Sequence, residues 1–357
     1  MSPPPREAPR PTPASGAPAR LLIVDDSVVA RAVIGRMIDS GDHFTVVGAV
    51  SDARAALAFL ADHQVEIVLL DIELPGTDGL SALPDILAAG KGAKVLVVSS
   101  SAHDGGAAAI QALALGAADT LEKPESGAQL GPFADLLAAK LGRLVHTRPN
   151  DSSSPTPSPL PLAQGDDFDV VAIGASTGGI HALSRLLRAI PPDFSLPILI
   201  TQHLPASFMP YFAAQIAMLA GRPCAVAAEH MRLTPGRVLL APGDAHIRVV
   251  RSGTGAAVRL DRQPVQSGCM PSVDPMFASV AQVYGARALA VVLSGMGRDG
   301  AQGARAVVDA GGCVIAQDQA SSVVWGMPGA VANAGIASAI LPPDVIGQVV
   351  VARRRVP

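Results

Sequence analysis

Asp169-Val170-Val171-Ala172-Ile173 runs directly into Gly174-Ala175-Ser176-Thr177-Gly178-Gly179, and this stretch decides the fold of the second half of the chain. The apolar run predicts a buried strand, the glycines predict a sharp turn, and the spacing from Ile180 to Ile190 predicts a helix. A serine on such a corner presents its hydroxyl beside backbone N–H groups, as a nucleophile requires. The same residues also suit an ordinary turn in which Ser176 caps the helix.

The rest of this half continues the alternation of strands and helices. Strands are predicted at 197–201, 225–228, 288–293 and 313–316, with helices at 207–219, 274–283, 301–310 and near Val345. We therefore expect a doubly wound, mostly parallel α/β domain over residues 167–352. Segments 238–241 and 247–251 are interpreted as a hairpin, with 258–260 as a further strand of a small antiparallel insert.

Two polar residues follow strands of this predicted sheet. His203 follows the strand at 197–201, and Asp299 follows the strand at 288–293. The carboxyl ends of parallel strands meet at one edge of a sheet, so both residues are expected near Ser176. A serine hydroxyl needs a base, and the base needs an orienting carboxylate. The three residues together predict a Ser-His-Asp triad, although Asp299 also suits a helix N-cap.

The first half of the chain has a second set of strand-end polar residues. Strands predicted at 21–24, 45–50, 65–70, 94–98 and 118–121 alternate with helices, which favours a flavodoxin-like (βα)5 domain over residues 20–143. At the strand ends stand Asp25, Asp26, Asp71, Ser99 and Lys123. Clustered carboxylates repel one another unless a cation is present, and hard oxygen ligands suit Mg²⁺. Lys123 and Ser99 can contact a phosphoryl group.

Composition limits the remaining possibilities. Residues 1–19 are rich in proline and are expected to be a disordered tail, and the Pro/Ser-rich segment 144–166 is expected to be a flexible linker. The net charge of −3 offers no basis for nucleic-acid binding, and no apolar run is long enough for a membrane span. The scattered cysteines and the missing signal peptide indicate a cytoplasmic protein, which we expect to be a monomer.

The first half resembles the receiver domain of two-component response regulators. The resemblance rests on Asp25-Asp26, on Asp71 in Asp71-Ile72-Glu73-Leu74-Pro75-Gly76-Thr77-Asp78-Gly79, on Ser99 and on Lys123-Pro124. It implies that a histidine kinase of the chemotaxis type phosphorylates Asp71. It also implies that the acidic pair, Asp71 and the backbone carbonyl of Glu73 hold Mg²⁺. Thr120 departs from the family, because many receivers carry an aromatic switch residue there.

The second half is similar to the catalytic domain of the CheB family of chemotaxis protein-glutamate methylesterases. The matching segments are Gly174 to Gly179, Gln202-His203-Leu204-Pro205, Pro271-Ser272-Val273-Asp274, Gly295-Met296-Gly297-Arg298-Asp299-Gly300, Gln317-Asp318 and Gly326-Met327-Pro328. The resemblance implies hydrolysis of glutamyl methyl esters and deamidation of glutamines on chemoreceptors, with no cofactor. It implies Ser176 as nucleophile, His203 as base and Asp299 as its orienting partner, with Thr177 and the Met296 N–H beside the oxyanion. It also implies that the chain meets membranes only through these receptors.

Some residues depart from this second pattern. Cys269-Met270 stand where a basic residue is usual, Gly329 where an arginine is common, Trp325 where a smaller aromatic is usual, and Met209 where threonine is frequent. These departures leave the receptor sites open, and a non-chemotaxis substrate remains an alternative. A catalytically idle regulator is a second alternative. A nucleic-acid-binding output domain is a third, but the only basic cluster, Arg353-Arg354-Arg355, is at the C-terminus. The domain order itself suggests that an unphosphorylated receiver covers the active site.

Overall fold

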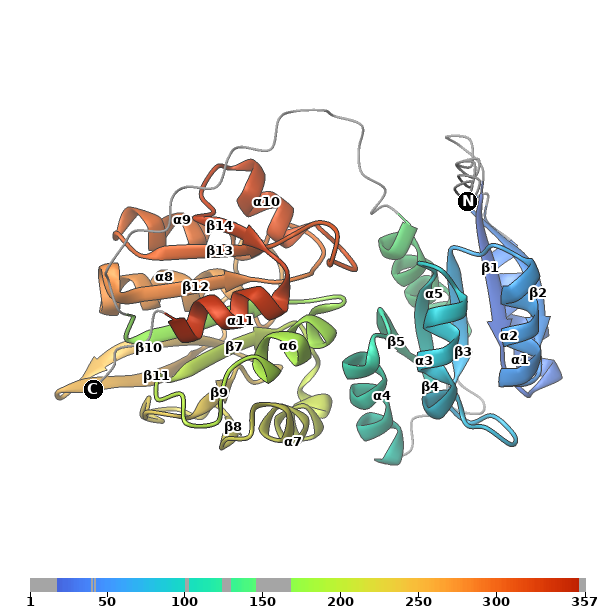
Figure 1. Cartoon of the computed structure of the whole chain (residues 1–357), viewed down its shortest axis with the longest axis horizontal. Helices are drawn as coiled ribbons and strands as arrows, with labels where there is room; N and C mark the ends of the chain where they lie inside the picture. The colour runs from blue at the N-terminus through green and yellow to red at the C-terminus, as the bar shows by residue number, and fades with distance from the viewer. Residues whose placement is uncertain are drawn as a thin grey trace, which may run out of the picture.

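The structure is a computed structural model that describes residues 18–39, 41, 43–99, 103–123, 130–145 and 168–352. Most of the expected tail, the linker from residue 146 onward and the basic cluster at the C-terminus lie outside the described residues. The described chain forms two α/β units that lie side by side (Figure 1).

The first unit contains a five-stranded sheet in the order β2-β1-β3-β4-β5, in which every described pair is parallel. This order confirms the flavodoxin-like fold. Its elements are β1 (Ala19–Val24), α1 (Val28–Asp39), β2 (Phe44–Val50), α2 (Ala53–Asp62), β3 (Ile67–Asp71), α3 (Gly79–Ala89), β4 (Lys94–Ser99), α4 (His103–Leu115), β5 (Asp119–Glu122) and α5 (Leu130–Val145).

The boundaries of this unit differ slightly from those expected. Ala19, expected in the tail, is buried at the start of β1, where its N–H donates to the His43 carbonyl. Leu144, expected in the linker, lies in α5 and is buried against the sheet. Differences of one or two residues at the end of an element are ordinary.

The second unit contains a seven-stranded sheet in the order β14-β13-β12-β6-β7-β9-β8 and a two-stranded sheet of β10 and β11. Its elements are β6 (Val170–Ala175), α6 (Gly179–Arg188), β7 (Ile198–Gln202), η1 (Ala206–Phe208), α7 (Met209–Ala220), β8 (Cys224–Val226), β9 (Val238–Leu240), β10 (His246–Ser252), β11 (Gly255–Asp261), α8 (Val273–Tyr284), η2 (Gly285–Arg287), β12 (Ala288–Val292), α9 (Ala301–Asp309), β13 (Cys313–Gln317), α10 (Met327–Asn333), β14 (Ala339–Leu341) and α11 (Pro343–Ala352). The expected α/β sheet with an antiparallel insert is confirmed.

The predicted hairpin between 238–241 and 247–251 is wrong. β9 pairs in parallel with β7 and β8, and β10 pairs in antiparallel with β11 instead. The side chains of Val238, Leu239 and Leu240 are all buried, as is typical of a strand covered on both faces. In contrast, Arg248 and Arg251 of β10 are partly or fully exposed, so this ribbon covers the core on one face only. The helix α10 and the strand β14 had no predicted counterpart.

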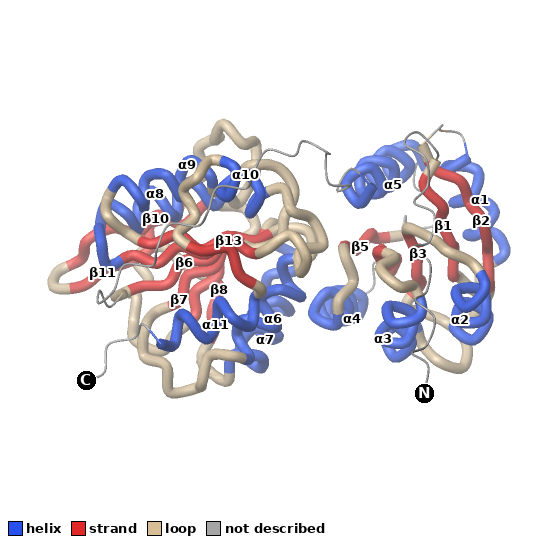
Figure 2. The backbone as a smooth tube through the Cα atoms, turned by 45° about the horizontal axis from the view of Figure 1, so that its top comes forward, coloured by secondary structure: helices blue, strands red, loops and turns tan. Residues whose placement is uncertain are grey.

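Both sheets are covered on both faces, because successive strand residues point to opposite sides. In β6, Val171 and Ile173 pack with α6, α7 and α11, whereas Val170 and Ala172 pack with α8, α9 and α10. Figure 2 shows these helix layers on the two sides of the sheet. The arrangement places the strand ends, rather than the sheet faces, in contact with solvent.

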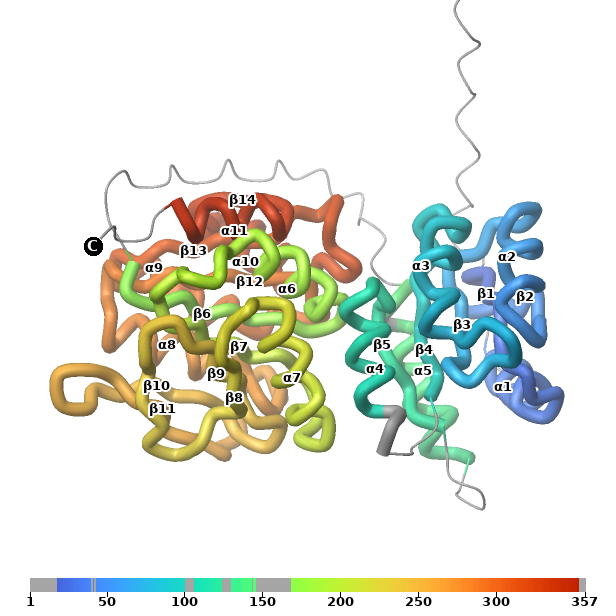
Figure 3. The backbone as a smooth tube through the Cα atoms, turned by 60° about the horizontal axis from the view of Figure 1, so that its bottom comes forward, coloured from blue at the N-terminus to red at the C-terminus, as the bar shows by residue number. Residues whose placement is uncertain are grey.

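The two units contact each other through α4, which faces α6 and α7 (Figures 1 and 3). Leu113 of α4 and Ile180 of α6 belong to one continuous cluster of buried apolar side chains. The Gly178 N–H donates to the Ala118 carbonyl at 3.1 Å. The His181 ring donates from Nδ1 to the Ala114 carbonyl at 3.3 Å. Among the described residues, no helix is both long and apolar enough to cross a membrane.

Candidate active site

The three candidate catalytic residues lie at one edge of the second sheet. Ser176 follows β6, His203 follows β7, and Asp299 lies in the loop after β12. These strands are neighbours in the order β12-β6-β7, and the chain reverses its direction of winding between β6 and β12. Ligands of doubly wound sheets bind at such a switch point. The structure therefore brings together residues that lie in three separate segments of the sequence.

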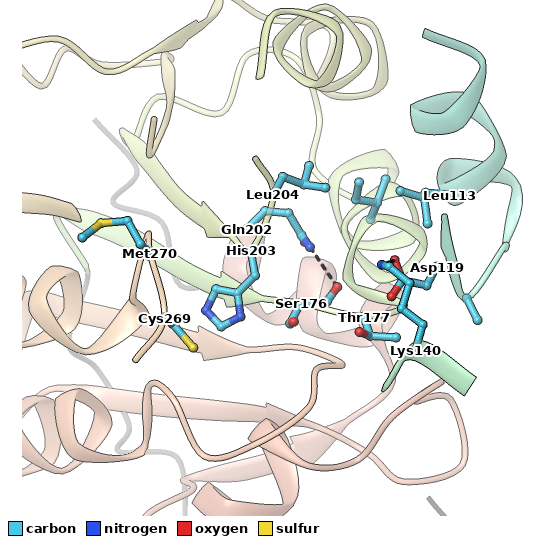
Figure 4. Close-up of a pocket in the computed structure, with 13 residues that line it drawn as sticks. Leu113, Asp119, Lys140, Ser176, Thr177, Gln202, His203, Leu204, Cys269 and Met270 are labelled. Atoms are coloured by element: carbon cyan, nitrogen blue, oxygen red, sulfur yellow. Dashed lines mark hydrogen bonds and ion pairs between the residues drawn. The ribbon is translucent and has the colours of Figure 1, made fainter. Parts of the chain in front are cut away.

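His203 and Asp299 are directly hydrogen-bonded. The Nε2–H of His203 donates to Asp299 Oδ2 at 2.8 Å. The side chain of Asp299 is 1% exposed and that of His203 is 17% exposed. In Figure 4 the His203 ring lies beside Ser176. Because Asp299 occupies Nε2, Nδ1 is the ring atom left to exchange a proton with the serine.

Asp299 is held by two further donors. Its Oδ1 accepts from the Ser272 hydroxyl at 2.6 Å, and its Oδ2 accepts from the Val273 N–H at 2.8 Å. The helix α9 is instead capped by Gly300, whose φ is +88°, without a side-chain hydrogen bond. The alternative interpretation of Asp299 as a helix cap is therefore wrong, since its carboxylate points at the histidine.

These contacts shift the pKa values of the pair in opposite directions. Burial alone would lower the pKa of His203, but the hydrogen bond from the ring to Asp299 outweighs it, and with Cys269 nearby the pKa is raised to about 9. Burial would raise the pKa of Asp299, but the donors on His203, Ser272 and Val273 lower it to about 2. Burial beside Asp299 raises the pKa of Asp274 to about 6. The pair is thus an imidazolium and a carboxylate near neutral pH.

The turn that carries Ser176 is fixed by backbone contacts. The Ser176 N–H donates to the Ser294 carbonyl at 3.0 Å, and its carbonyl accepts from Gln202 Nε2 at 2.8 Å. Gly178 has φ +74° and caps α6 without a side-chain bond. The alternative in which Ser176 caps this helix is therefore wrong. The hydroxyl stays available at the cavity wall.

The loop after β12 approaches this turn closely because Gly295 has no side chain. A Cβ atom at Gly295 would lie 2.8 Å from the Cβ of Ser176 and 2.3 Å from the sulfur of Met327. The next residue is Met296, which is 44% exposed. This approach is compatible with the expected place of Thr177 and the Met296 N–H beside an oxyanion, which remains a proposal.

Two cavities meet at the candidate triad. One, of about 240 Å³, is lined by Ser176, Thr177 and His203 and, from the first unit, by Leu113, Ala118, Asp119 and Lys140. Figure 4 shows Leu113, Asp119 and Lys140 facing the serine from the other unit. The other cavity, of about 680 Å³, is lined by Met296, Arg298, Asp299 and Arg305. Cys269 lines both cavities.

Several residues that support the site have no role in the sequence-based predictions. Ser272 holds Asp299, and the Ser272 N–H in turn donates to Nδ1 of His246, which is fully buried. Gln202 holds the serine turn, and the Ser294 hydroxyl donates to the Thr177 carbonyl at 2.8 Å. Gln202 and Ser272 lie inside the quoted motifs, so their position was visible, but their partners were not.

Two of the noted departures compensate for each other. A Cβ atom at Gly329 would lie 3.0 Å from the ring of Trp325, so the larger aromatic occupies the space that a side chain at 329 would need. The Trp325 ring N–H donates to the Gln317 carbonyl at 3.0 Å. Met209 is buried at the start of α7. Gly329, Trp325 and Met209 lie outside the linings of the two cavities.

The strand-end acids of the first unit also converge. The carboxylates of Asp25, Asp26 and Asp71 have oxygen atoms within 4.8 Å of one another. Lys123 Nζ bridges Asp71 at 2.6 Å and Asp25 at 3.0 Å, and the Glu73 N–H donates to Asp71 Oδ1 at 3.2 Å. Three carboxylates with one ammonium leave a negative site. This donor set fits a hard divalent cation such as Mg²⁺.

Charge and burial oppose each other at this acidic site. Burial raises the pKa of Asp71 although Lys123 acts to lower it. Burial would lower the pKa of Lys123, but its bonds to Asp71 and Asp25 raise it. Ser99 ends β4 and is buried, and its carbonyl accepts from the Lys123 N–H at 2.8 Å. Thr120 is half-buried in β5.

Comparisons with known proteins agree with both halves of this description. The "CheB methylesterase" family matches residues 171–350, and the "response regulator receiver domain" family matches residues 21–132. A protein-glutamate methylesterase/protein-glutamine glutaminase 1 of Paramagnetospirillum magneticum is 39% identical, covering 94% of this chain and 96% of its own. One of Azospirillum brasilense is 38% identical, covering 97% and 95%.

A solved structure resembles the second unit. The crystal structure of the Thermotoga maritima CheB methylesterase catalytic domain superposes with a TM-score of 0.51 at 33% identity. It covers 52% of this chain and 98% of that domain. The chain therefore belongs to the CheB methylesterase family and carries a response regulator receiver domain ahead of its methylesterase domain.

Proposed function

We propose that this chain is a phosphorylation-activated serine hydrolase that removes methyl groups from glutamyl methyl esters of chemoreceptors. Release of methanol would restore the glutamate, and the same chemistry on glutamine would release ammonia. The hydrogen bond from His203 to Asp299, beside Ser176 at the switch point of the sheet, carries this proposal. Relatives named for both reactions over nearly the whole chain support it.

In this proposal Ser176 is the nucleophile. His203 takes the hydroxyl proton at Nδ1 as the oxygen attacks the ester carbonyl, and the resulting imidazolium is stabilised by Asp299. The ester C–O bond then breaks, and His203 returns the proton to the leaving methoxide as methanol. A water molecule then attacks the acyl-serine and gives a proton to His203. His203 passes this proton to the Ser176 oxygen as the acyl bond breaks, which releases the glutamate.

The N–H groups of Thr177 and Met296 would face the oxyanion. The short approach of the Gly295 loop to Ser176 supports this assignment. In other hydrolases the loss of one oxyanion donor lowers kcat roughly 10²- to 10³-fold. A backbone donor at Met296 would survive replacement of its side chain, so this residue tolerates substitution better than Gly295.

The receiver domain would control this chemistry through Asp71. Asp71 would accept a phosphoryl group from a histidine kinase of the chemotaxis type, while Lys123 and Ser99 contact its oxygens. Mg²⁺, when bound, would neutralise the carboxylates and the incoming phosphoryl group. Asp25, Asp26, Asp71 and the backbone carbonyl of Glu73 would hold it.

We further propose that the docked receiver limits access to Ser176. Leu113, Ala118, Asp119 and Lys140 line the smaller cavity, and the Ala118 carbonyl accepts a bond from the nucleophile turn. A receptor segment that reached Ser176 through this cavity would need the space that these residues occupy. Phosphorylation of Asp71 would then favour the undocked state. Such a chain would work in the cytoplasm as a monomer, reaching membranes only through receptors.

Incubation with membranes that carry methyl-labelled chemoreceptors tests the activity. The wild-type chain with a small phosphodonor should release labelled methanol, and Ser176→Ala should not. Release by Ser176→Ala would exclude the serine mechanism. Release from free glutamyl methyl esters but not from chemoreceptors would assign the hydrolase to another substrate, and no release from either would indicate an idle domain.

The gating is tested with the same assay. The full chain is compared with and without phosphodonor, and a fragment beginning at Gly165 provides the ungated rate. The unphosphorylated full chain should be slowest. Equal rates in all three samples would contradict the gating.

A further inference from the structure

Cys269 lies beside the candidate triad, on the loop between β11 and α8. Its sulfur, a ring nitrogen of His203 and a carboxylate oxygen of Asp299 are all within 4.8 Å of one another. Cys269 is half-buried and lines both cavities, so this group of three can be reached from solvent. The triad chemistry described above does not use the thiol.

One thiol, one imidazole and one carboxylate form the donor set of a borderline-soft divalent cation. Zn²⁺ binds such ligands in tetrahedral geometry, whereas Mg²⁺ and Ca²⁺ take oxygen ligands. Bond lengths of about 2.0 to 2.3 Å place tetrahedral ligand atoms ~3.2 to 3.8 Å apart. The 2.8 Å contact between His203 and Asp299 would open by less than about 1 Å.

The surrounding contacts permit this rearrangement. Cys269 is tied to Ser267 by long contacts, 3.3 Å from its N–H to the hydroxyl and 3.8 Å from its sulfur to the carbonyl. Its side chain can therefore turn toward the histidine. Asp299, in contrast, is held in place by the Ser272 hydroxyl and the Val273 N–H, and such partners orient metal-binding carboxylates.

The charges also balance. A thiolate and a carboxylate together neutralise a divalent cation, and the thiol proton of Cys269 and the Nε2 proton of His203 pass to solvent on binding. We propose that His203, Cys269 and Asp299 form a binding site for Zn²⁺ or a cation of its class, and that the bound cation stops ester hydrolysis. When Nε2 of His203 binds the cation, the neutral ring keeps its proton on Nδ1. Nδ1 then cannot accept the proton of Ser176.

The binding part of this inference stands without any hydrolase activity and is tested with Co²⁺ as a spectroscopic probe. The untagged full chain is titrated with Co²⁺ in excess Mg²⁺, which occupies the all-oxygen site at Asp25, Asp26 and Asp71. We expect a thiolate-to-Co²⁺ charge-transfer band in the near ultraviolet that saturates at about one equivalent and disappears when Zn²⁺ is added. Absence of this band overturns the site.

The variant Cys269→Ser identifies the ligand, and Cys224→Ser is its matched control. Cys224 lies on β8, and burial raises the pKa of its thiol to about 12, so it is a poor source of thiolate. The band should vanish in Cys269→Ser and persist in Cys224→Ser. A band that survives in Cys269→Ser places the cation elsewhere and overturns the proposal.

The inhibitory part rests on the proposed function. Methanol release by each variant is measured with and without Zn²⁺ and expressed relative to its own zinc-free rate. Wild type and Cys224→Ser should be inhibited and recover with a chelator, whereas Cys269→Ser should need at least about tenfold more Zn²⁺. Equal inhibition of all three contradicts the assignment. A zinc-free chain without any methanol release would contradict the proposed function while leaving the Co²⁺ result intact.

Discussion

Replacing Asp299 by asparagine removes the carboxylate that keeps His203 protonated, so we expect the pH dependence of ester hydrolysis to change with it. The pKa of His203 is raised from 6.5 to about 9. At about 1.4 kcal/mol per pKa unit, this shift corresponds to about 3 kcal/mol of preference for the imidazolium. Catalysis needs the neutral ring, of which only ~1% is present two units below its pKa.

In the wild type, kcat/KM should therefore rise about tenfold from pH 7 to pH 8 and level off above about pH 9. In Asp299→Asn, the loss of the hydrogen bond and of the charge of Asp299 should lower the pKa of His203, so kcat/KM should rise less steeply than in the wild type over this range. The plateau should fall by up to ~10⁴-fold, because the ring loses its orienting partner. Methanol release from methylated receptors, measured with saturating phosphodonor at each pH, provides the rates.

The pair of His203 and Asp299 also contributes to the free energy of unfolding, and the direction of the pKa shift of His203 gives the sign of this contribution. A raised pKa in the folded state stabilises the fold below the unfolded value of 6.5, and this contribution is lost as the pH rises through about 9. Urea unfolding should therefore show a loss of stability in this range that Asp299→Asn lacks. Asp244→Asn is the matched control, because Asp244 pairs with Arg262 at an exposed site. A wild-type kcat/KM that stays constant between about pH 7 and pH 9 would contradict this prediction, as would a kcat/KM of Asp299→Asn that rises as steeply as that of the wild type.

Gly295→Ala should abolish hydrolysis, because the added Cβ would lie 2.8 Å from the Cβ of Ser176. Measurements of kcat and of the melting temperature check this expectation. Gly106→Ala should raise the hydrolysis rate of the unphosphorylated chain severalfold. Its Cβ would lie 2.8 Å from the ring of Tyr211 and would displace the receiver domain from the second unit. Asp71→Asn should keep the unphosphorylated rate but lose the response to phosphodonor, as measured by methanol release.

Matched glycines provide the controls for the first two variants. Gly142 and Gly131 both lie in α5 with open space around the position of a Cβ, so alanine there should leave the rates unchanged. An active Gly295→Ala would contradict the close packing against Ser176. An unphosphorylated rate of Gly106→Ala equal to that of Gly131→Ala would contradict docking by α4, and a phosphodonor response in Asp71→Asn would move the phosphorylation site elsewhere.

Most of the fold was accessible from local patterns. Alternating apolar strands and helices predicted both parallel sheets, because strands buried on two faces must be apolar along their length. The pairing of β9 was not accessible, since a short apolar strand beside Pro242-Gly243-Asp244 suits a hairpin as well as a parallel neighbour. The strand with which β9 pairs depends on the open edge of the sheet beside β7, and a local sequence pattern does not describe that edge. The α10 helix was missed for a similar reason, because Met327-Pro328 at its start reads locally as a turn.

The amino-acid sequence was enough to identify the reactive residue types. These are a serine on a glycine-flanked turn, a histidine and an aspartate after strands, and a cluster of acidic residues with one lysine. Residue type and its position at a strand end carry that information, because parallel strands must deliver their ends to one edge. Only the tertiary structure decided the contacts. It aimed Asp299 at His203 rather than at the α9 N-terminus, brought Ser272 and Gln202 into support, and placed Cys269 beside the histidine. These contacts join segments distant in sequence, so they depend on how the sheets and helices pack and not on any local pattern.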